Sequence, residues 1–302
     1  MKIAFTGTTG FVGSNLLPYL QNLGYLTFEV SRNLICDEQA TLSFNNSKVM
    51  VHLAGKAHDL KKTSNDSEFY ETNYMLTKKV YDAFLSSDAI VFISLSSVKA
   101  SADKVKGILT ELNPPNPVTH YGKSKLLAEE YIFSQEIPKD KRVYVLRPCM
   151  IHGPVNKGNL NLLYKIVSKK IPWPLGSFDN KRSFCSIDNL MFIIKEIIER
   201  EDIPSGIYNV ADDEPLSTNE LINLMAISQN RKSNIWKIPK GFIYRLAKLG
   251  DVLYLPLNTD RLQKLTDSYI VSNQKIKDAI GKPLPVSSRD GLLKTFKTFK
   301  HL

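Results

Sequence analysis

Three glycines near the start of the chain constrain its fold more than any other feature. Gly7, Gly10 and Gly13 stand between an apolar segment at 2–6 and a segment at 14–23 whose leucines recur at helical spacing. A strand, a glycine-rich turn and a helix in this order let a pyrophosphate approach the backbone at the positive end of a helix dipole. The pattern therefore predicts a dinucleotide-binding unit here.

Alternating strand and helix patterns continue after the glycine turn. Further strands are predicted at 25–31, 49–53, 89–94 and 143–146, and helices at 70–85 and 124–133. Strands that alternate with helices predict an α/β fold, a Rossmann-type doubly wound parallel sheet that carries helices on both faces. About sixteen residues separate Arg32 from the strand at 49–53, which is too few for an additional helix and strand, so we expect a reduced sheet edge there.

Glycine and proline interrupt the pattern midway through the chain. We expect residues 1–155 to form the dinucleotide-binding domain, with a returning helix and strand at about 186–211. Residues 156–302 then form mainly a smaller C-terminal substrate-binding lobe, and the active site lies in the crevice between the two. Within the lobe, Ser217 and Glu220 have the spacing of a capping box at the start of a helix.

The charge of the chain narrows the class of its partners. The net charge is +10, which suits nucleic acid, an anionic membrane surface or an anionic substrate. Adjacent lysines form only pairs, without a basic block that carries interleaved aromatics, so we expect no nucleic-acid partner. The most apolar late stretch, 243–257, is interrupted by Arg245, Lys248 and Asp251, and we predict no membrane span.

Cysteine and histidine usage bears on compartment and metals. The three cysteines and the histidines show no metal-ligand spacing, so we expect neither a metal nor a structural disulfide. The first residues run directly into the glycine motif without a leader pattern, and we expect a cytoplasmic protein. His52, inside an apolar strand, is expected to be a core residue, and Cys149 to be packing rather than a nucleophile.

A tyrosine, a lysine and a serine supply the candidate catalytic groups. Tyr121 and Lys125 lie four residues apart at the start of a predicted helix and so share one face. Hydride transfer at a carbinol needs a group that exchanges the hydroxyl proton, and tyrosine does so only where a cation stabilises its phenolate. Lys125 supplies that cation and a contact to the nicotinamide ribose. Ser97, at the end of a strand, offers a second hydroxyl to the substrate oxygen.

The end of the second strand bears on the choice between NAD and NADP. An acidic residue there binds the adenosine ribose of NAD, whereas a basic residue accommodates the 2′-phosphate of NADP. Ser31 and Arg32 end this strand, while Glu29 lies earlier. The cofactor is therefore NADP or NAD, with a preference for NADP.

These motifs together resemble the extended short-chain dehydrogenase/reductase family, the group of nucleotide-sugar epimerases, reductases and dehydratases. The matching segments are 6–13, 51–55, Asn73 with Thr77, 121–125, and 146–148 leading to 152–154. The resemblance implies that the cofactor is bound by Gly7, Thr9, Gly10, Phe11, Val12, Gly13, Ser31, Arg32, Leu53, Ala54, Gly55, Asn73, Lys125 and Pro148.

The resemblance also implies roles around the substrate. Tyr121 becomes the general acid/base with Lys125 as its partner, and Ser97 rather than Ser96 the third catalytic member, a choice that stays open. The implied diphosphate contacts are Asn159 and Arg182, with Arg261 as a second candidate, and arginine suits them because its fork binds phosphate oxygens in pairs.

Three functions remain open at this point. The first is a reductase of a UDP-linked 4-keto sugar of the N-acetylhexosamine type, as used for surface polysaccharides, and the preference for NADP favours it. The alternatives are a UDP-sugar 4-epimerase and a non-catalytic NAD(P)-binding sensor or scaffold. Dehydration is disfavoured because Val98 and Lys99, rather than an Asp-Glu pair, follow Ser97. We expect a homodimer.

Overall fold

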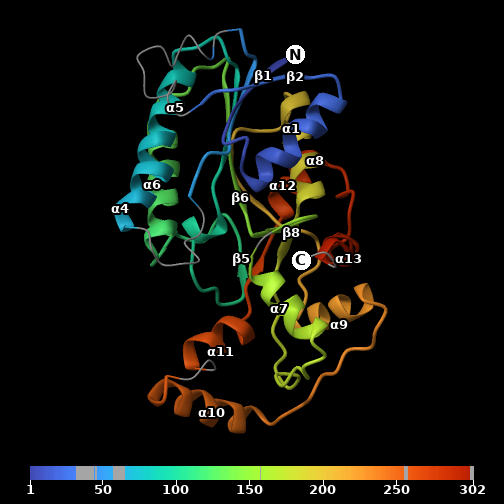
Figure 1. The fold of residues 1–302 in the computed structure, drawn as a ribbon. Helices are drawn as coiled ribbons and strands as arrows, with labels where there is room; N and C mark the ends of the chain where they lie inside the picture. The colour runs from blue at the N-terminus through green and yellow to red at the C-terminus, as the bar shows by residue number, and fades with distance from the viewer. Residues whose placement is uncertain (32–43, 45, 57–64, 157, 255–257, 300–302) are drawn as a thin grey trace.

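A six-stranded parallel sheet forms the larger part of the molecule (Figure 1). The computed structural model describes residues 1–31, 44, 46–56, 65–156, 158–254 and 258–299. The strand order is β2-β1-β3-β4-β6-β9, and every neighbouring pair is parallel. The strands are β1 (Lys2–Thr6), β2 (Leu26–Glu29), β3 (Val49–His52), β4 (Val91–Leu95), β6 (Arg142–Pro148) and β9 (Gly206–Val210).

Helices cover both faces of this sheet, as Figure 1 shows. One face carries α1 (Phe11–Asn22), α8 (Ile187–Glu199) and α12 (Gln274–Ile280). The other carries α5 (Leu76–Leu85) and α6 (His120–Ser134). The alternation of side chains along the strands explains both layers: Ile3 and Phe5 of β1 enter the core beneath α1 and α8, while Ala4 enters the core beneath α5.

The C-terminal lobe has an apolar core of its own. It is built mainly from α7 (Asn159–Ser168), α9 (Thr218–Ser228), α10 (Lys240–Val252), α11 (Thr259–Thr266) and α13 (Ser288–Thr298). Two small parallel sheets lie between this core and the main sheet: β5 (Ile108–Leu109) with β10 (Ile270–Val271), and β7 (Met150–His152) with β8 (Phe184–Ser186). The lobe is thus tied to the larger part at several points of the chain.

The expected fold class is confirmed, with two adjustments. The predicted helix at 70–85 begins earlier and is interrupted, since α4 (Asp66–Phe69) runs into a π-helical segment η1 (Tyr70–Met75) before α5. The first helix likewise begins at Phe11 rather than at residue 14. In the described part of the chain β2 is the edge strand beside β1, whereas the reduced edge expected after Arg32 falls mostly outside the described residues and stays a prediction. Separate domains divided at residue 155 stay a prediction.

In the described part of the chain, no helix combines the length and the apolar character that spanning a bilayer requires.

Candidate active site

The glycine turn joins β1 to α1 at the carboxyl edge of the sheet. Gly7 has a φ of +74°, and a Cβ there would lie 2.5 Å from the amide nitrogen of Ala54. A Cβ on Gly13 would lie 2.6 Å from the carbonyl oxygen of Gly7. These two positions therefore require glycine so that the turn can pack against the loop after β3 and against itself.

The same turn offers an open anion site, which is the test of whether a dinucleotide fits. Among the described residues a Cβ on Gly10 would meet only the Gly7 carbonyl oxygen, at 3.4 Å, so this part of the chain leaves the space beside Gly10 open. Gly10 is the N-cap of α1 and, in the described chain, no side chain caps that helix, which leaves its first amides available. The Thr8 hydroxyl is buried with no partner among the described residues. Donors without partners at a helix N-terminus suit a pyrophosphate.

The three candidate catalytic side chains come together from two elements. Tyr121 and Lys125 lie in the first turns of α6, and Ser97 follows β4 as the N-cap of η2 (Val98–Ala100). The Ser97 hydroxyl hydrogen-bonds the Tyr121 hydroxyl. Lys125 donates from Nζ to the carbonyl oxygen of Leu95 at 2.9 Å. The sequence-based trio is thus one spatial cluster.

Burial sets the electrostatics of this cluster. It raises the pKa of the Tyr121 hydroxyl above its ordinary value, and the Ser97 hydrogen bond opposes that shift. It lowers the pKa of the Lys125 ammonium to about 8, and the Glu129 charge opposes that shift. A buried acid and a buried base with displaced pKa values on one helix face are typical of a proton-transfer site.

The start of α6 is held by groups that fix Tyr121. Thr119 caps the helix by accepting from the amide of Gly122 at 3.2 Å. The Asp103 carboxylate accepts from the amides of Val118 and Thr119 at 2.6 and 2.9 Å. These contacts fix the first turn, and with it the tyrosine that follows the cap by two residues.

A buried ion pair beneath the cluster was not anticipated from the sequence. Glu129 of α6 accepts from Nε of Arg147 at 3.0 Å through both carboxylate oxygens, and Ser96 also donates its hydroxyl to Glu129. Both charged side chains are almost fully buried. The spacing 121, 125, 129 places Glu129 on the helix face of the catalytic pair, and this was the signal available in the sequence. Ser96 therefore has a partner of its own, distinct from that of Ser97.

Asn73 organises the loop that follows β3. Its side chain accepts from the amide of Lys56 at 2.8 Å and donates to the carbonyl of Lys56 and the hydroxyl of Ser124, both at 3.0 Å. A Cβ on Gly55 would lie 2.8 Å from Nζ of Lys125 and 3.1 Å from Oδ1 of Asn73. Gly55, Asn73 and Lys125, which are expected to hold the cofactor, are thus adjacent. Asn73 lies in the π-helical segment, and such deviations from the α-helix are common at functional sites.

The remaining cofactor candidates lie along the same edge, except one. Leu53 and Ala54 directly follow β3, and the Leu53 amide donates to the Thr6 carbonyl at 3.1 Å. Pro148 ends β6, opposite Val210 of β9. Ser31 lies exposed two residues beyond β2. Arg32, on which the preference for NADP depends, lies outside the described residues.

Two cationic side chains lie on the lobe side of the site. Arg182 donates from Nε to the carbonyl oxygen of Asp267 at 3.0 Å, and from Nη2 to that of Lys264 at the end of α11. Burial lowers the pKa of the Lys99 ammonium. The charge of Asp103 opposes this shift, and the charge of Arg182 adds to it. Its Nζ lies 4.3 Å from the ring centroid of Tyr269. In the sequence Lys99 is only a departure from the dehydratase pattern. The structure shows that its charge lies near that of Arg182.

The other substrate candidates are more peripheral. Asn159 is exposed as the first residue of α7, and Arg261 is exposed on α11.

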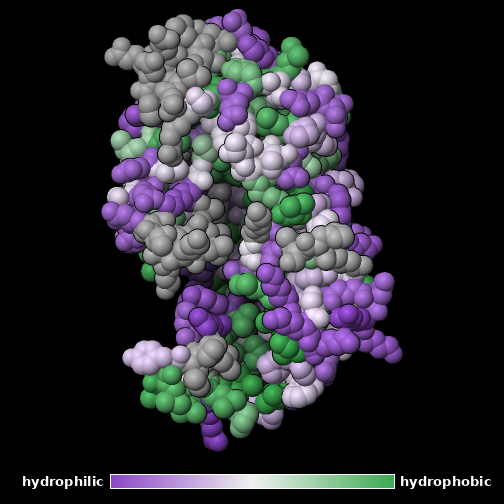
Figure 2. Space-filling view, viewed as in Figure 1, coloured by the Kyte–Doolittle hydropathy of each residue, from purple (hydrophilic) through white to green (hydrophobic). Residues whose placement is uncertain are grey.

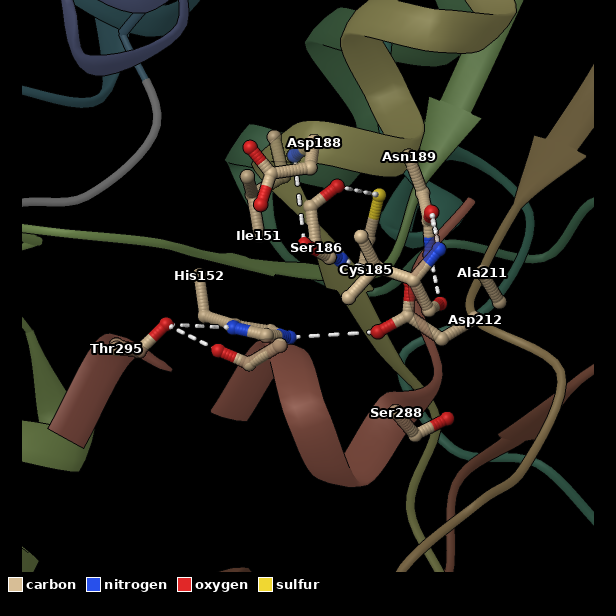
Figure 3. Close-up of polar contacts among 12 residues, drawn as sticks. Ile151, His152, Cys185, Ser186, Asp188, Asn189, Ala211, Asp212, Ser288 and Thr295 are labelled. Carbon is tan, nitrogen blue, oxygen red and sulfur yellow. Dashed lines mark hydrogen bonds and ion pairs between the residues drawn. The ribbon is translucent and has the colours of Figure 1, made fainter. Parts of the chain in front are cut away.

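A second buried polar cluster lies at the junction with the lobe (Figure 3). His152 hydrogen-bonds Thr295 of α13 through Nδ1 at 3.0 Å and Asp212 through Nε2 at 3.3 Å. Asp212 also accepts from the amide of Ser186 at 2.8 Å and from the side chain of Asn189 at 2.7 Å. The described polar side chains of this cluster form hydrogen bonds to one another, and we assign the cluster a structural role at the junction.

Other residues singled out in the sequence take structural positions. His52 is buried between Thr6 and Thr77, with which its ring nitrogens form hydrogen bonds of 2.6 and 2.9 Å, so the prediction of a core histidine is confirmed. Cys149 and Cys185 are free and buried, and burial raises the pKa of both thiols well above the ordinary value. In the described ranges no three metal-binding side chains gather.

Comparison with known proteins identifies relatives along nearly the whole chain. The family model described as "NAD dependent epimerase/dehydratase family" matches residues 3–211. The chain is 29% identical to a UDP-glucose 4-epimerase of Vibrio cholerae, over 99% of this chain and 95% of that protein. It is also 29% identical to the N-acetyl-alpha-D-glucosaminyl-diphospho-ditrans,octacis-undecaprenol 4-epimerase of Escherichia coli O157:H7, over 91% of this chain and 84% of that protein.

A solved structure shows the same fold at lower identity. The UDP-glucuronic acid 4-epimerase of Bacillus cereus, in complex with UDP-glucuronic acid and NAD, superposes with a TM-score of 0.75 at 19% identity. The superposition covers 100% of this chain and 99% of that one.

Proposed function

The chain belongs to the NAD dependent epimerase/dehydratase family, and from that premise we propose that it is a 4-epimerase of a UDP-linked sugar. The observation that carries the proposal is the joining of Tyr121, Ser97 and Lys125 in a chain that is 29% identical to two 4-epimerases over more than nine-tenths of its length. This favours the epimerase over the 4-keto-sugar reductase that the sequence alone placed first.

The proposed chemistry assigns one task to each side chain. A nicotinamide cofactor held near Lys125 and Asn73 would supply a reversible hydride acceptor for carbon 4, and inversion would follow from return of the hydride to the opposite face of the 4-keto sugar. Tyr121 takes the proton of the 4-hydroxyl and gives it back, while Ser97 holds the same oxygen by hydrogen bonding. Lys125 stabilises the phenolate, because an ammonium in a site of low dielectric lowers the cost of the negative charge.

We propose that the cofactor lies along the carboxyl edge of the sheet. The turn at Gly7, Gly10 and Gly13 would hold its pyrophosphate, and Lys125 and Asn73 would hold the ribose next to the nicotinamide. The preference for NADP over NAD rests on Ser31 and Arg32 and stays a prediction. Titration of both cofactors into wild type and Arg32→Ala tests it: an affinity for NADP that does not change in the variant would contradict the role of Arg32.

The diphosphate of the substrate is assigned to the lobe side. We propose that Arg182 and Lys99 both contact this diphosphate, because two neighbouring cations complement the charges of two phosphates. Asn159 and Arg261 are further candidates, and both stay predictions.

The test is a direct assay of stereochemistry. Purified protein is incubated with UDP-glucose and with UDP-N-acetylglucosamine, and proton NMR follows the conversion at carbon 4. Conversion without net consumption of cofactor supports the epimerase. If NADPH is instead consumed in proportion to a UDP-linked 4-keto sugar, and no epimer forms, the reductase replaces it.

A variant separates catalysis from binding alone. Tyr121→Phe should lower turnover by about 10²–10⁴-fold while leaving cofactor affinity unchanged, since it removes one hydroxyl. A protein in which neither wild type nor variant turns over any sugar, while both bind cofactor, would be a sensor or scaffold.

Assembly and compartment are part of the proposal. We propose a homodimer in the cytoplasm, and the exposed Leu127 and Phe133 of α6 are candidate contact residues. Sedimentation equilibrium of wild type and Leu127→Glu tests it: a monomeric wild type would contradict the dimer.

A further inference from the structure

Helix α10 carries a stripe of apolar side chains that faces solvent. Phe242, Leu246 and Leu249, with Leu253 just past the helix end, follow one another at intervals of four, three and four residues, which puts them on one face. They are 55%, 39%, 50% and 56% exposed. Figure 2 shows apolar residues gathered at this end of the lobe. A contiguous stripe of this kind marks an interaction surface.

The stripe is distinct from the face that anchors the helix. Ile243, Ala247 and Gly250 are buried against the lobe, and the Tyr244 ring meets that of Phe178 edge-on at 5.7 Å. The helix is therefore seated by one face, and the apolar stripe lies beside that face, unused by the described part of the fold.

Basic residues border the stripe and decide which partner it suits. Segment 231–254 contains six basic residues and one acidic residue, so its net charge of +5 is half of the +10 of the whole chain. Exposed Arg245 and Lys248 lie on α10 itself, while Nζ of Lys240, at the start of the helix, lies 5.7 Å from the ring centroid of Phe178 on the anchoring side. Exposed Trp236 precedes the helix in the chain and exposed Tyr254 follows it. Aromatic rings of this kind favour the interface between lipid headgroups and acyl chains.

From this combination we propose that α10 is a docking surface for an anionic lipid bilayer, lying in the plane of the membrane with Phe242, Leu246, Leu249 and Leu253 inserted below the headgroups. Apolar side chains on one face, flanked by lysine and arginine, are the features of an interfacial helix, and anionic headgroups attract the basic border. An anionic lipid surface explains why half of the net positive charge lies in this segment, whereas a protein partner in general does not.

The surface is close to the proposed substrate site. Helix α10 packs against α11, whose carbonyl of Lys264 accepts from Arg182. If the proposed function is correct, a docked enzyme holds its diphosphate contact, Arg182, one helix away from the lipid. The docking itself does not depend on that function.

The experiment is co-sedimentation with vesicles. Wild type is mixed with vesicles of equal parts phosphatidylglycerol and phosphatidylcholine, and with vesicles of phosphatidylcholine alone. We expect binding to the anionic vesicles that weakens with salt, and little binding to the neutral ones. Phe242→Glu/Leu249→Glu should lower the apparent affinity by roughly tenfold or more, since two large apolar side chains lose their insertion.

A matched control tests whether the effect belongs to this surface. Leu26→Glu/Ile227→Glu removes two apolar side chains of similar exposure, 69% and 54%, and adds the same charge elsewhere. Equal loss of binding in both double variants would overturn the proposal, as would wild type that ignores anionic vesicles. A third overturning result is a lower assembly mass for Phe242→Glu/Leu249→Glu in sedimentation equilibrium, which would make α10 a contact between copies.

Activity separates this proposal from the proposed function. Phe242→Glu/Leu249→Glu should epimerise soluble UDP-sugar as fast as wild type, because its changes lie outside the site. Vesicle binding by a wild type that epimerises no sugar would support the docking surface and reject the epimerase. Epimerisation with no vesicle binding would do the reverse.

Discussion

Arg147 of β6 and Glu129 of α6 form a nearly inaccessible ion pair that joins the sheet to the catalytic helix, with Nε at 3.0 Å from each carboxylate oxygen. The Ser96 hydroxyl donates to the same carboxylate. Because Tyr121 and Lys125 lie on the same face of α6 as Glu129, the pair fixes the rotation and depth of the face that carries the catalytic groups.

Removing one partner of this pair should cost much more than removing both. Arg147→Met leaves a carboxylate buried without its cation, and we expect a loss of about 3–5 kcal/mol in the free energy of unfolding. Arg147→Met/Glu129→Leu removes both charges and should recover most of that loss. Urea denaturation of the three proteins measures it. A double variant no more stable than the single would show that the charges are not coupled.

Substitutions of two glycines in the turn should differ in their effects on stability and on cofactor affinity. Gly13→Ala brings a methyl group within 2.6 Å of the Gly7 carbonyl oxygen, and we expect a loss of about 1–3 kcal/mol in stability. Gly10→Ala meets only an ordinary contact of 3.4 Å, so its stability should change by less than about 1 kcal/mol while cofactor affinity falls. Thermal unfolding and cofactor titration separate the two. Full affinity in Gly10→Ala would reject the pyrophosphate position.

Ser97→Ala should shift the pH dependence of turnover. The Ser97 hydrogen bond lowers the pKa of Tyr121, so its removal raises that pKa and leaves less phenolate at neutral pH. Activity should fall about 10–100-fold at neutral pH and recover in part as the pH rises. The matched variant Ser96→Ala, which loses a bond to Glu129, should leave the position of the profile unchanged. A shift in Ser96→Ala alone would exchange the roles of the two serines.

His52 should make the protein sensitive to acid. Burial, followed by the Lys125 charge, lowers the pKa of His52 to about 3 from the ordinary 6.5. The unfolded state therefore binds a proton that the folded state does not, between these two values, so stability decreases as the pH falls from 6.5 toward 3. At pH 4 the loss is about 3 kcal/mol. His52→Gln should lose less stability over this range, and an equal loss would assign the acid sensitivity to other groups.

The sequence predicted features in which neighbours along the chain determine the structure. The glycine turn follows from a strand and a helix that flank it, and the capping box of Ser217 and Glu220 is present at the start of α9 as predicted. Tyr121 and Lys125 share a helix face because of their spacing alone. In each case the periodicity of one element carries the information.

Features that depend on packing between distant segments were not predicted. The Glu129–Arg147 pair joins a helix to a strand, and only the fold reveals that an arginine in an apolar strand has a buried partner. The π-helical turn at Tyr70–Met75 has no local sequence signature, because the extra residue is accommodated by tertiary contacts such as those of Asn73. The contact of Arg182 with the end of α11 likewise joins residues more than eighty positions apart.

His152 has a consequence for how the chain acquires its structure during synthesis. It emerges from the ribosome near the midpoint of the chain, yet its ring nitrogens are hydrogen-bonded to Asp212 and Thr295. β6 likewise pairs with β9, a strand that is translated later. The sheet lacks its last strand until residue 210 has been translated, and the His152 ring lacks its second hydrogen-bond partner, Thr295, until residue 295 has been translated. We therefore expect the final packing step to come late and to include both parts of the molecule at once.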